Sequence, residues 1–151
     1  MYSAVIAVSR AEIGAVHADS HRRQADAYRP RIRAGIEIGQ CIPADLYLRA
    51  QRIRRRARAD LAPLLARYDA LVMPSALGPA PDRSTTGDAA LNGPWTGLGL
   101  PAVSVPTGLT AEGLPLGTQL IGGPFEEARL LTAARWVEAV IGFKDAPPTT
   151  P

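Results

Sequence analysis

Few residues of this chain have the type and spacing that chemistry requires. His17 and His21 lie four residues apart in a segment that we expect to be helical, so both side chains share one face. That spacing can bind zinc when a glutamate beside the first histidine acts as the base, but the residues between them are Ala18, Asp19 and Ser20. With no third ligand apparent, we expect solvent-facing histidines and no metal site.

The hydroxyl, thiol and amine groups lack partners that would activate them. Ser104 lies between two valines in a strand-like run, and the chain has no Gly-x-Ser-x-Gly sequence. Cys41 is the single cysteine and has no histidine at a recognisable spacing. Lys144 is the single lysine and follows the last expected helix, in a segment too loose to position a general base. We therefore expect no catalytic residue in this chain.

The segment from Asn92 to Phe125 has the composition of a pocket wall. Two short apolar runs lie among closely spaced glycines and prolines, which permit backbone to approach a ligand. Asn92 offers a donor and an acceptor, Trp95 a large flat surface and Thr96 a hydroxyl. Small-molecule pockets combine apolar surface with a few polar groups in this way. These three residues are our candidate substrate-pocket residues, with a loop-anchoring role for Trp95 as the equal alternative.

The composition indicates a globular chain rather than a disordered one. It has 151 residues, 46% of them hydrophobic and 21% charged, with a net charge of +3. The basic residues are almost all arginines, a bias that often reflects the base composition of a genome rather than function. We therefore expect no nucleic-acid partner. No apolar run has the length of a membrane span, and no basic segment precedes the apolar start as in a signal peptide. We expect a cytoplasmic location and no membrane partner.

The first part of the chain, residues 1–68, is expected to be helical. Ile6, Ile13 and Val16 recur at helical intervals, and Pro30 begins a second helix that Gly39 ends. The third helix begins at Pro43 and carries an arginine-rich solvated face over residues 52–58. Pro63 predicts a kink or break in it. Its apolar stripe consists of Leu46, Ala50, Ile53, Ala57, Leu61, Leu64 and Tyr68.

Residues 69–141 are expected to form strands, pocket loops and a packing helix. We predict strands at residues 70–73, which we expect to be buried on both faces, and at 102–105 and 116–121, the last two joined as a hairpin by residues 110–113. Residues 78–88 form a long irregular loop of the kind that usually has a function. Pro124 begins the last helix, with a buried stripe of Leu130, Ala134, Val137 and Ile141.

These elements predict an α/β fold in a single partial domain over residues 1–151. The predicted strands number three, whereas a sheet usually has about five or six. Strands buried on both faces therefore need neighbours that this segment does not supply. Residues 142–151 are expected to form a loose tail.

The order of these features resembles the amidase signature family. The opening helices, with His17 and residues 28–30, are similar to the helical region that precedes the family's C-terminal strands. The resemblance extends over nearly the whole chain but over only about the last third of a typical member. The matching segments are residues 69–74, 92–96, 99–106, 113–122 and 124–131.

The resemblance implies the C-terminal portion of a fold in which helices cover both faces of a large mixed sheet. It implies hydrolysis of a carboxamide to a carboxylate and ammonia or an amine, with no cofactor. The family's serine nucleophile, second serine and lysine base lie in a Gly/Ser-rich region that nothing in this sequence matches. No catalytic residue is therefore carried over, and we expect this chain to be inactive alone. Asn92, Trp95 and Thr96 would lie near the acyl pocket.

Several functional alternatives stay open at this point. The implied partners are a small amide substrate and a complementary N-terminal chain, or a second copy of this chain. The chain could instead belong to the A subunit of an amidotransferase that uses misacylated tRNA. It could also be a split-enzyme partner or a non-catalytic interaction remnant. A basic nucleic-acid-binding protein is the third-ranked alternative. The DNA upstream of Met1 would distinguish a truncated gene, a split gene and a misassigned start.

Overall fold

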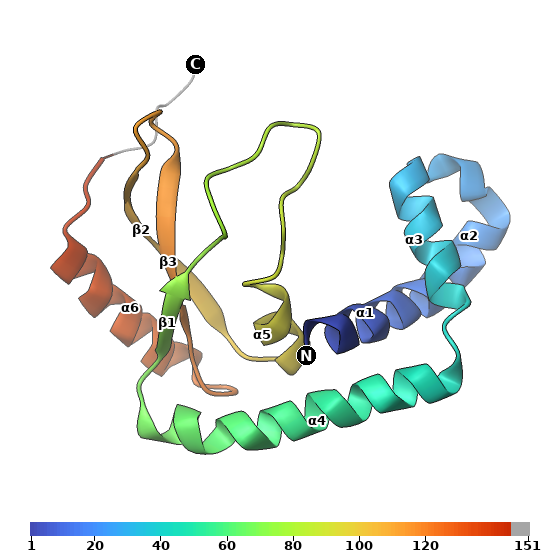
Figure 1. The fold of residues 1–151 in the computed structure, drawn as a ribbon, viewed down its shortest axis with the longest axis horizontal. Helices are drawn as coiled ribbons and strands as arrows, with labels where there is room; N and C mark the ends of the chain where they lie inside the picture. The colour runs from blue at the N-terminus through green and yellow to red at the C-terminus, as the bar shows by residue number, and fades with distance from the viewer. Residues whose placement is uncertain (146–151) are drawn as a thin grey trace. The chain divides into compact units, whose positions relative to one another are not determined.

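A computed structural model describes residues 1–145 of the chain (Figure 1). The chain consists of two compact units. The first unit ends at Asp60 and the second begins at Leu61. The boundary falls within a helix, eight residues before Asp69, where the sequence predicts a change from helices to strands and loops. The expected single partial domain stays a prediction. From residue 146 on, the expected loose tail lies outside the described residues.

The first unit is entirely helical. Pro30 begins a helix as expected, but Gly39 lies inside that helix, which continues to Gln40. A separate short helix and a 3-10 turn follow a break at His17, which the sequence did not predict. The elements are α1 (Tyr2–Val16), α2 (Ala18–Gln24), η1 (Ala25–Ala27), α3 (Pro30–Gln40) and the first part of α4 (Ala44–Arg67).

Glycines allow α1 and α3 to pack with their backbones in contact. A Cβ atom at Gly14 would lie 2.6 Å from the backbone nitrogen of Gln40, and one at Gly39 would overlap the carbonyl oxygen of Arg10. Gly39 is therefore needed for close approach inside the helix, not to end it.

The buried face of α1 differs from the predicted one. Ile6, Ile13 and Val16 are exposed, although the helix itself is confirmed. The buried positions are Ala4, Val8 and Gly14, and the two apolar side chains pack with Ala50 of α4. Small side chains occupy this face because the larger isoleucines would hold the helices apart.

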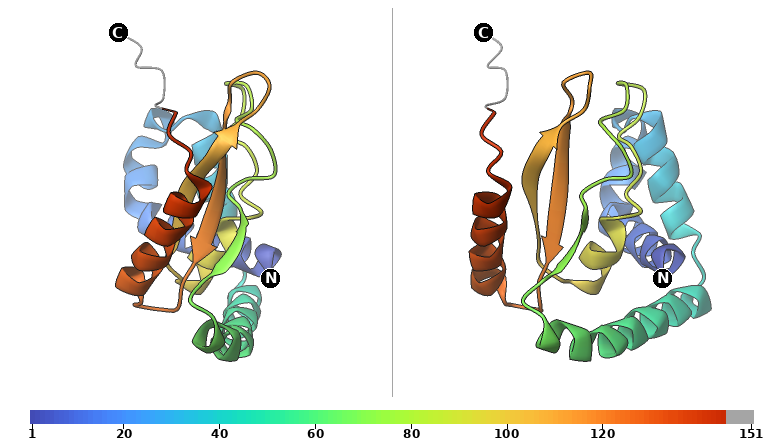
Figure 2. Two further views of the ribbon diagram at one scale, coloured as in Figure 1. Left: turned by 90° about the vertical axis from the view of Figure 1, so that its left-hand side faces the viewer. Right: turned by 60° about the vertical axis from the view of Figure 1, so that its left-hand side comes forward.

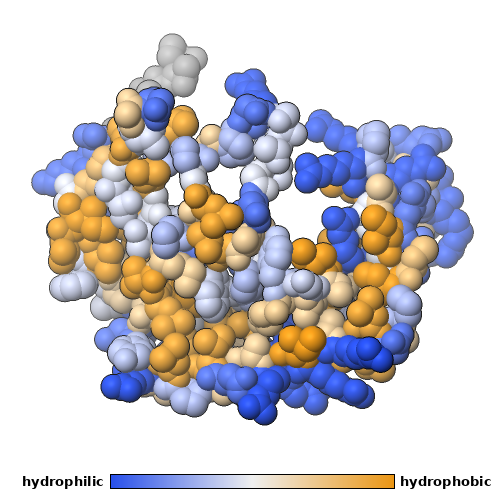
Figure 3. All heavy atoms as spheres, in the orientation of Figure 1, coloured by the Kyte–Doolittle hydropathy of each residue, from blue (hydrophilic) through white to orange (hydrophobic). Residues whose placement is uncertain are grey.

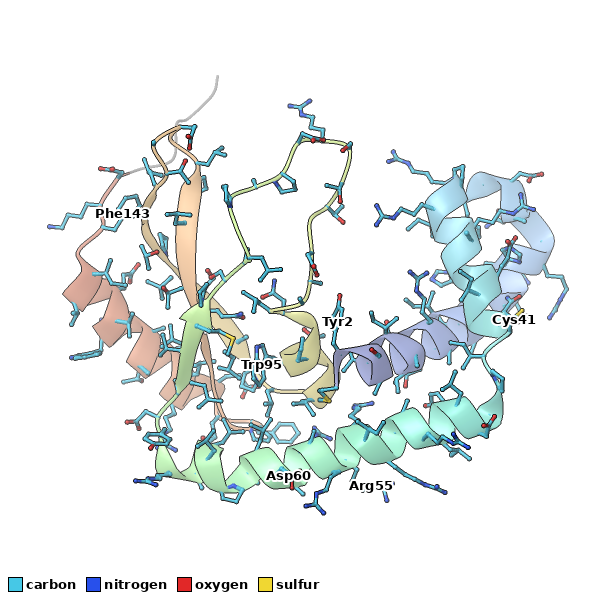
Figure 4. All side chains as sticks on the ribbon, in the orientation of Figure 1. Tyr2, Cys41, Arg55, Asp60, Trp95 and Phe143 are labelled. Atoms are coloured by element: carbon cyan, nitrogen blue, oxygen red, sulfur yellow. The ribbon has the colours of Figure 1, made fainter. Side chains whose placement is uncertain are left out.

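The long helix α4 continues through Pro63, so the proline does not break the helix, and the kink, which is the other outcome expected from the sequence, stays a prediction. Pro63 and Ala59 are both exposed, so water can replace the backbone hydrogen bond that the proline removes. The predicted apolar stripe is largely wrong, because Ala50 is buried but Leu46, Ile53, Leu64 and Tyr68 are exposed, and Leu65 is buried instead. The predicted solvated face is confirmed: Arg55 extends away from the helix in Figure 4, and hydrophilic residues follow α4 in Figure 3.

The second unit is built on a three-stranded antiparallel sheet in the order β1-β3-β2. The predicted hairpin of β2 and β3 is confirmed, and Thr110 and Leu114 close its turn with a backbone hydrogen bond of 2.8 Å. Helices and sheet together confirm the α/β class. The elements are β1 (Leu71–Pro74), α5 (Gly93–Leu98), β2 (Ala102–Leu109), β3 (Pro115–Ile121) and α6 (Glu127–Ile141).

Helix α6 covers one face of this sheet, and the loop after β1 lies with α5 on the other (Figure 2). Leu130 and Ala134 of α6 pack on Val105 and Leu120, as the predicted stripe requires, but Ile141 at the end of that stripe is exposed. Strand β1 is not buried on both faces, since Val72 is 59% exposed. In the described part of the chain β1 is an edge strand, and α6 packs on its neighbours instead.

Two helix boundaries in this unit differ from the sequence prediction. Helix α6 begins at Glu127 rather than Pro124, because Phe125 adopts a left-handed φ of 61° that a helix cannot include. The short helix α5 was not predicted. Its signals are Pro94 in the first turn and Gly99, whose φ of 65° ends the helix.

Within the described part of the chain, every helix is too short or too polar to span a lipid bilayer.

Candidate functional site

The second unit contains a cleft of about 1010 Å³ between the loop after β1 and the β2–β3 hairpin. This loop is the long irregular segment that the sequence predicts. Its exposed backbone and the cleft-facing side of the hairpin supply the walls. The lining residues are 74–81 and 86–88, Asn92, residues 104, 106 and 107 of β2, and residues 115–118 of β3.

Two serine hydroxyls lie together at the hairpin side of the cleft. Ser75 follows β1 and Ser104 lies on β2, and their Oγ atoms are 2.6 Å apart. Side chains of a strand alternate between the sheet faces, so Ser104 points away from the face that packs Val105 on α6. A Cβ atom at Gly117 would lie 2.8 Å from the Ser104 hydroxyl and 2.9 Å from that of Ser75. The glycine therefore makes room for this pair.

A buried glutamine lies directly behind the cleft. Gln119 is 4% exposed, and its Nε2 donates hydrogen bonds to the carbonyl oxygens of Pro74 at 3.1 Å and Leu91 at 3.0 Å. Those carbonyls belong to the residues on either side of the loop. The cleft wall is thus tied to the central strand at both ends.

The three candidate pocket residues have different surroundings in the structure. Asn92 is exposed and lines the cleft. Thr96 is exposed and is not a lining residue of the cleft. Trp95, labelled on α5 in Figure 4, is half-buried, and its indole Nε1 is buried without a hydrogen-bond partner among residues 1–145. The structure therefore brings only Asn92 to the cleft.

Sequence reasoning missed Ser75, Thr107, Thr118 and Gln119, and treated Ser104 as a framework residue. Strand alternation was the available signal, because Ser104 and Gln119 occupy the same face when β2 and β3 pair in the observed register. The position of Ser75 could not be found this way, since it depends on how β1 pairs with β3.

The cleft is nearly free of charge. Its lining includes one carboxylate, Asp88, whose Oδ1 accepts a hydrogen bond of 2.8 Å from the backbone of Ala90. Outside the lining, a hydrogen bond from Ser84 lowers the pKa of the Asp82 carboxyl. No lysine, arginine or histidine of residues 1–145 lines the cleft, and among these residues the two serine hydroxyls bond only to each other, so neither contacts a base. The arrangement can orient a ligand through hydroxyl and amide groups, but it cannot activate a nucleophile.

The histidines take part in a polar network of the first unit. The Nδ1 atom of His17 lies 3.0 Å from the Tyr28 hydroxyl, and His21 Nε2 lies 3.2 Å from Glu37 Oε1. Arg33 donates to the same Glu37 oxygen at 2.9 Å, and this hydrogen bond lowers the pKa of Glu37. The expectation of solvent-facing histidines is wrong, because both rings are half-buried between helices of the unit. No group of three or more possible metal ligands occurs within residues 1–145.

The sequence matches a family described as Amidase over residues 3–131. The chain belongs to this family, which confirms the resemblance to amidase signature enzymes. It is 40% identical to the A subunit of the glutamyl-tRNA(Gln) amidotransferase from Parvibaculum lavamentivorans over 109 residues, 67% of this chain and 22% of that protein. It is 33% identical to the putative amidase AmiD of Mycobacterium tuberculosis over 143 residues, 87% of this chain and 30% of that protein.

A crystal structure of an amidase has the same arrangement of elements. It superposes with a TM-score of 0.84 at 26% sequence identity, over 92% of this chain and 35% of the amidase. The fold prediction of an amidase C-terminal portion is thereby confirmed. The chain spans about a third or less of the length of the relatives it matches.

Proposed function

We propose that this chain supplies a substrate-binding wall of an enzyme that hydrolyses carbon–nitrogen amide bonds. Family membership supports the reaction class. The cleft of the second unit supports the binding role, because it combines apolar surface with a few directed hydroxyl and amide groups. The substrate is a small carboxamide, and the products are a carboxylate and ammonia or an amine.

The observation that carries this proposal is that the cleft has hydroxyl and amide groups but no lysine, arginine or histidine of residues 1–145 in its lining. Amide hydrolysis requires an activated nucleophile and a base within hydrogen-bond reach of it. Ser75 and Ser104 bond to each other, and no base of residues 1–145 contacts either hydroxyl. We therefore propose that the chain binds substrate while catalytic groups come from the part of an amidase that it does not match. No cofactor is part of this proposal.

We propose a place in this site for all three residues selected from the sequence. Asn92 contacts substrate directly from the cleft wall. Trp95 supports the wall, and its buried indole Nε1, which has no hydrogen-bond partner among residues 1–145, requires an acceptor, since buried donors rarely remain unsatisfied. Thr96 lies on the same short helix, and we propose that its exposed hydroxyl, which is outside the cleft lining, meets substrate at the edge of the site.

The proposal includes a complementary amidase portion as a partner and a cytoplasmic location. The relatives, of which this chain matches about a third or less, support the partner. Cys41 is exposed and free, which fits a reducing compartment. An alternative as a remnant that only binds a partner is less well supported, because the cleft and its polar lining are present.

A chimera tests the proposed function. This chain replaces the matching 30% of the mycobacterial putative amidase, and ammonia release is measured over a panel of aliphatic and aromatic carboxamides. We expect the chimera to hydrolyse at least one carboxamide and the chain alone to hydrolyse none. A well-folded chimera without activity would contradict the proposal. Turnover by the chain alone that Ser104→Ala abolishes would contradict the assignment of binding without chemistry.

A further inference from the structure

Gln119 is the one polar side chain that is buried among the residues the structure describes. It lies on β3, the central strand of the sheet, between Met73 of β1 and Ser104 of β2 in register. Burial of an amide is unfavourable unless its hydrogen bonds are made. Both donors of its nitrogen are used here, one for each carbonyl.

The two acceptors fix the orientation of the glutamine amide. A backbone carbonyl only accepts hydrogen bonds, so the side-chain nitrogen, with its two hydrogens, must face both Pro74 and Leu91. These carbonyls flank residues 75–90, the loop that forms one wall of the cleft. One side chain therefore holds the two ends of the loop at a fixed separation.

Little else determines where this loop lies. Residues 76–89 are all exposed, so no apolar burial holds them in place. Hydrogen bonds within the loop are local, such as Ser84 to Asp82 and Gly87 to Thr85, and set turns rather than position. At the first end, the Ser75 amide also donates to the Gly117 carbonyl at 2.9 Å. The hydroxyl of Ser75 also lies 2.6 Å from that of Ser104 on β2, so the first end has other ties to the sheet. At the second end, the bond from Gln119 to the Leu91 carbonyl ties the loop to the sheet.

We propose that Gln119 is a positioning residue for the substrate cleft. Its side-chain amide sets the separation of the loop ends and so the width of the wall that carries Asn92. The role of the cleft in substrate binding rests on the proposed function. The pair of hydrogen bonds from Gln119 to the two loop ends, which we call the clamp, does not. Loss of the two donors opens the loop ends while the hairpin stays paired.

Two variants and one control separate this role from general stability. Gln119→Met keeps the volume of the side chain and removes both donors. Gln119→Glu keeps the shape but places a carboxylate oxygen against two carbonyl oxygens, so it is the stronger perturbation. Val105→Ala removes buried volume from the opposite face of the same sheet without touching the loop contacts.

Amide hydrogen exchange of the full chain, resolved by NMR, tests the clamp. In Gln119→Met, we expect the amides of Ser75, Asn92 and Gly93 to exchange about tenfold faster, the factor expected for one buried hydrogen bond. The amides of the β2–β3 ladder are expected to change less, and Gln119→Glu is expected to have the larger effect at the loop ends. Val105→Ala is expected to accelerate ladder and loop-end amides together.

Three results would overturn the positioning role. The first is equal acceleration of loop-end and ladder amides in Gln119→Met, as in the control. The second is unchanged exchange at the loop ends. The third is complete unfolding of both Gln119 variants under conditions where Val105→Ala stays folded, which would make Gln119 a general core residue.

The chimera adds a functional measurement with a separate outcome. If Gln119 positions a binding wall, Gln119→Met raises KM about tenfold and leaves kcat within about twofold. Faster loop-end exchange in a chimera without amide turnover would refute the proposed function and leave the clamp in place. Amide turnover with unchanged exchange and KM would refute the clamp and leave the proposed function in place.

Discussion

The two units of this chain use the same kinds of residue for different purposes. In the first unit, Gly14 and Gly39 bring two helix backbones into contact. In the second unit, Gly117 leaves space for two hydroxyl groups beside a cleft. In the first unit, the space left by the missing glycine side chains allows two helices to pack closely. In the second unit, the same kind of space is part of a candidate site.

Polar groups show the same contrast. In the first unit, the side chains of His21 and Arg33 each bond to the Glu37 carboxylate. In the second unit, the hydroxyls that line the cleft are neutral and exposed enough to meet a ligand. Charged networks of this kind stabilise a helical unit, while uncharged groups in a cleft can recognise an amide without a large desolvation cost.

The largest expected effect is Gly39→Ala in the first unit. The new methyl group overlaps the Arg10 carbonyl, and backbone cannot move aside as a side chain can. We expect a loss of about 3 kcal/mol in the free energy of unfolding of the first unit. Urea unfolding followed by far-UV circular dichroism, which the helices dominate, measures it.

Tryptophan fluorescence supplies the comparison with the second unit. Both tryptophans, Trp95 and Trp136, belong to that unit, so their transition should move less than the circular dichroism transition. Gly78→Ala is the matched control, since no atom of residues 1–145 lies within 4 Å of the added methyl group. Equal effects of the two alanine variants would contradict the importance of the helix contact.

A smaller effect is expected for Gly117→Ala in the second unit. The added methyl group must push apart the hydroxyls of Ser75 and Ser104, which costs about 2 kcal/mol. The double variant Gly117→Ala/Ser104→Ala removes one obstacle and should recover part of this loss. Chemical unfolding followed by tryptophan fluorescence measures the free energy of unfolding of the parent protein, the two single variants and the double variant. Additive effects would show that the contact is unimportant.

A stabilising change is expected at Phe125. Its φ of 61° is unfavourable for any residue with a Cβ atom, and its side chain is 94% exposed, so it contributes little packing. Phe125→Gly should stabilise the second unit by about 1 kcal/mol. Phe125→Ala keeps the unfavourable dihedral and should change stability less. Thermal unfolding compares the three proteins, and equal effects of glycine and alanine would argue against backbone strain.

The smallest expected effect is the pH dependence of the first unit. The hydrogen bond from Arg33 holds the pKa of Glu37 below its ordinary value of 4.5. A lowered folded pKa stabilises the unit above the unfolded pKa, and this contribution is lost as pH falls through the folded pKa. The melting temperature of the first unit should therefore fall as the pH drops below 4.5, and it should fall less steeply in Glu37→Gln. Identical profiles would exclude a role for this carboxylate.

Local patterns predicted most of the fold. Helical periodicity indicated the helices around residues 2–16 and 44–67, and the turn at residues 110–113 indicated the hairpin. Periodicity could not identify the buried face of α1, because close helix contact selects small residues rather than the largest apolar ones. The tolerance of Pro63 depends on solvent exposure, which sequence spacing does not contain.

The candidate site was less predictable than the fold. Asn92 was found because it lies among closely spaced glycines and prolines. Ser75 and Gln119 join the site through strand pairing over long sequence separations, with the glutamine 45 residues along the chain from its Pro74 acceptor. Such contacts follow from register, and register is set by tertiary packing.

The kinetics of Asn92→Ala in the chimera test the central claim most directly. The claim is that this chain supplies substrate binding and not the chemical step. It predicts that KM for the best carboxamide rises about tenfold while kcat stays within about twofold of the parent value. A kcat reduced at least about a hundredfold with unchanged KM would contradict it, because a residue of this chain would then act in the chemical step.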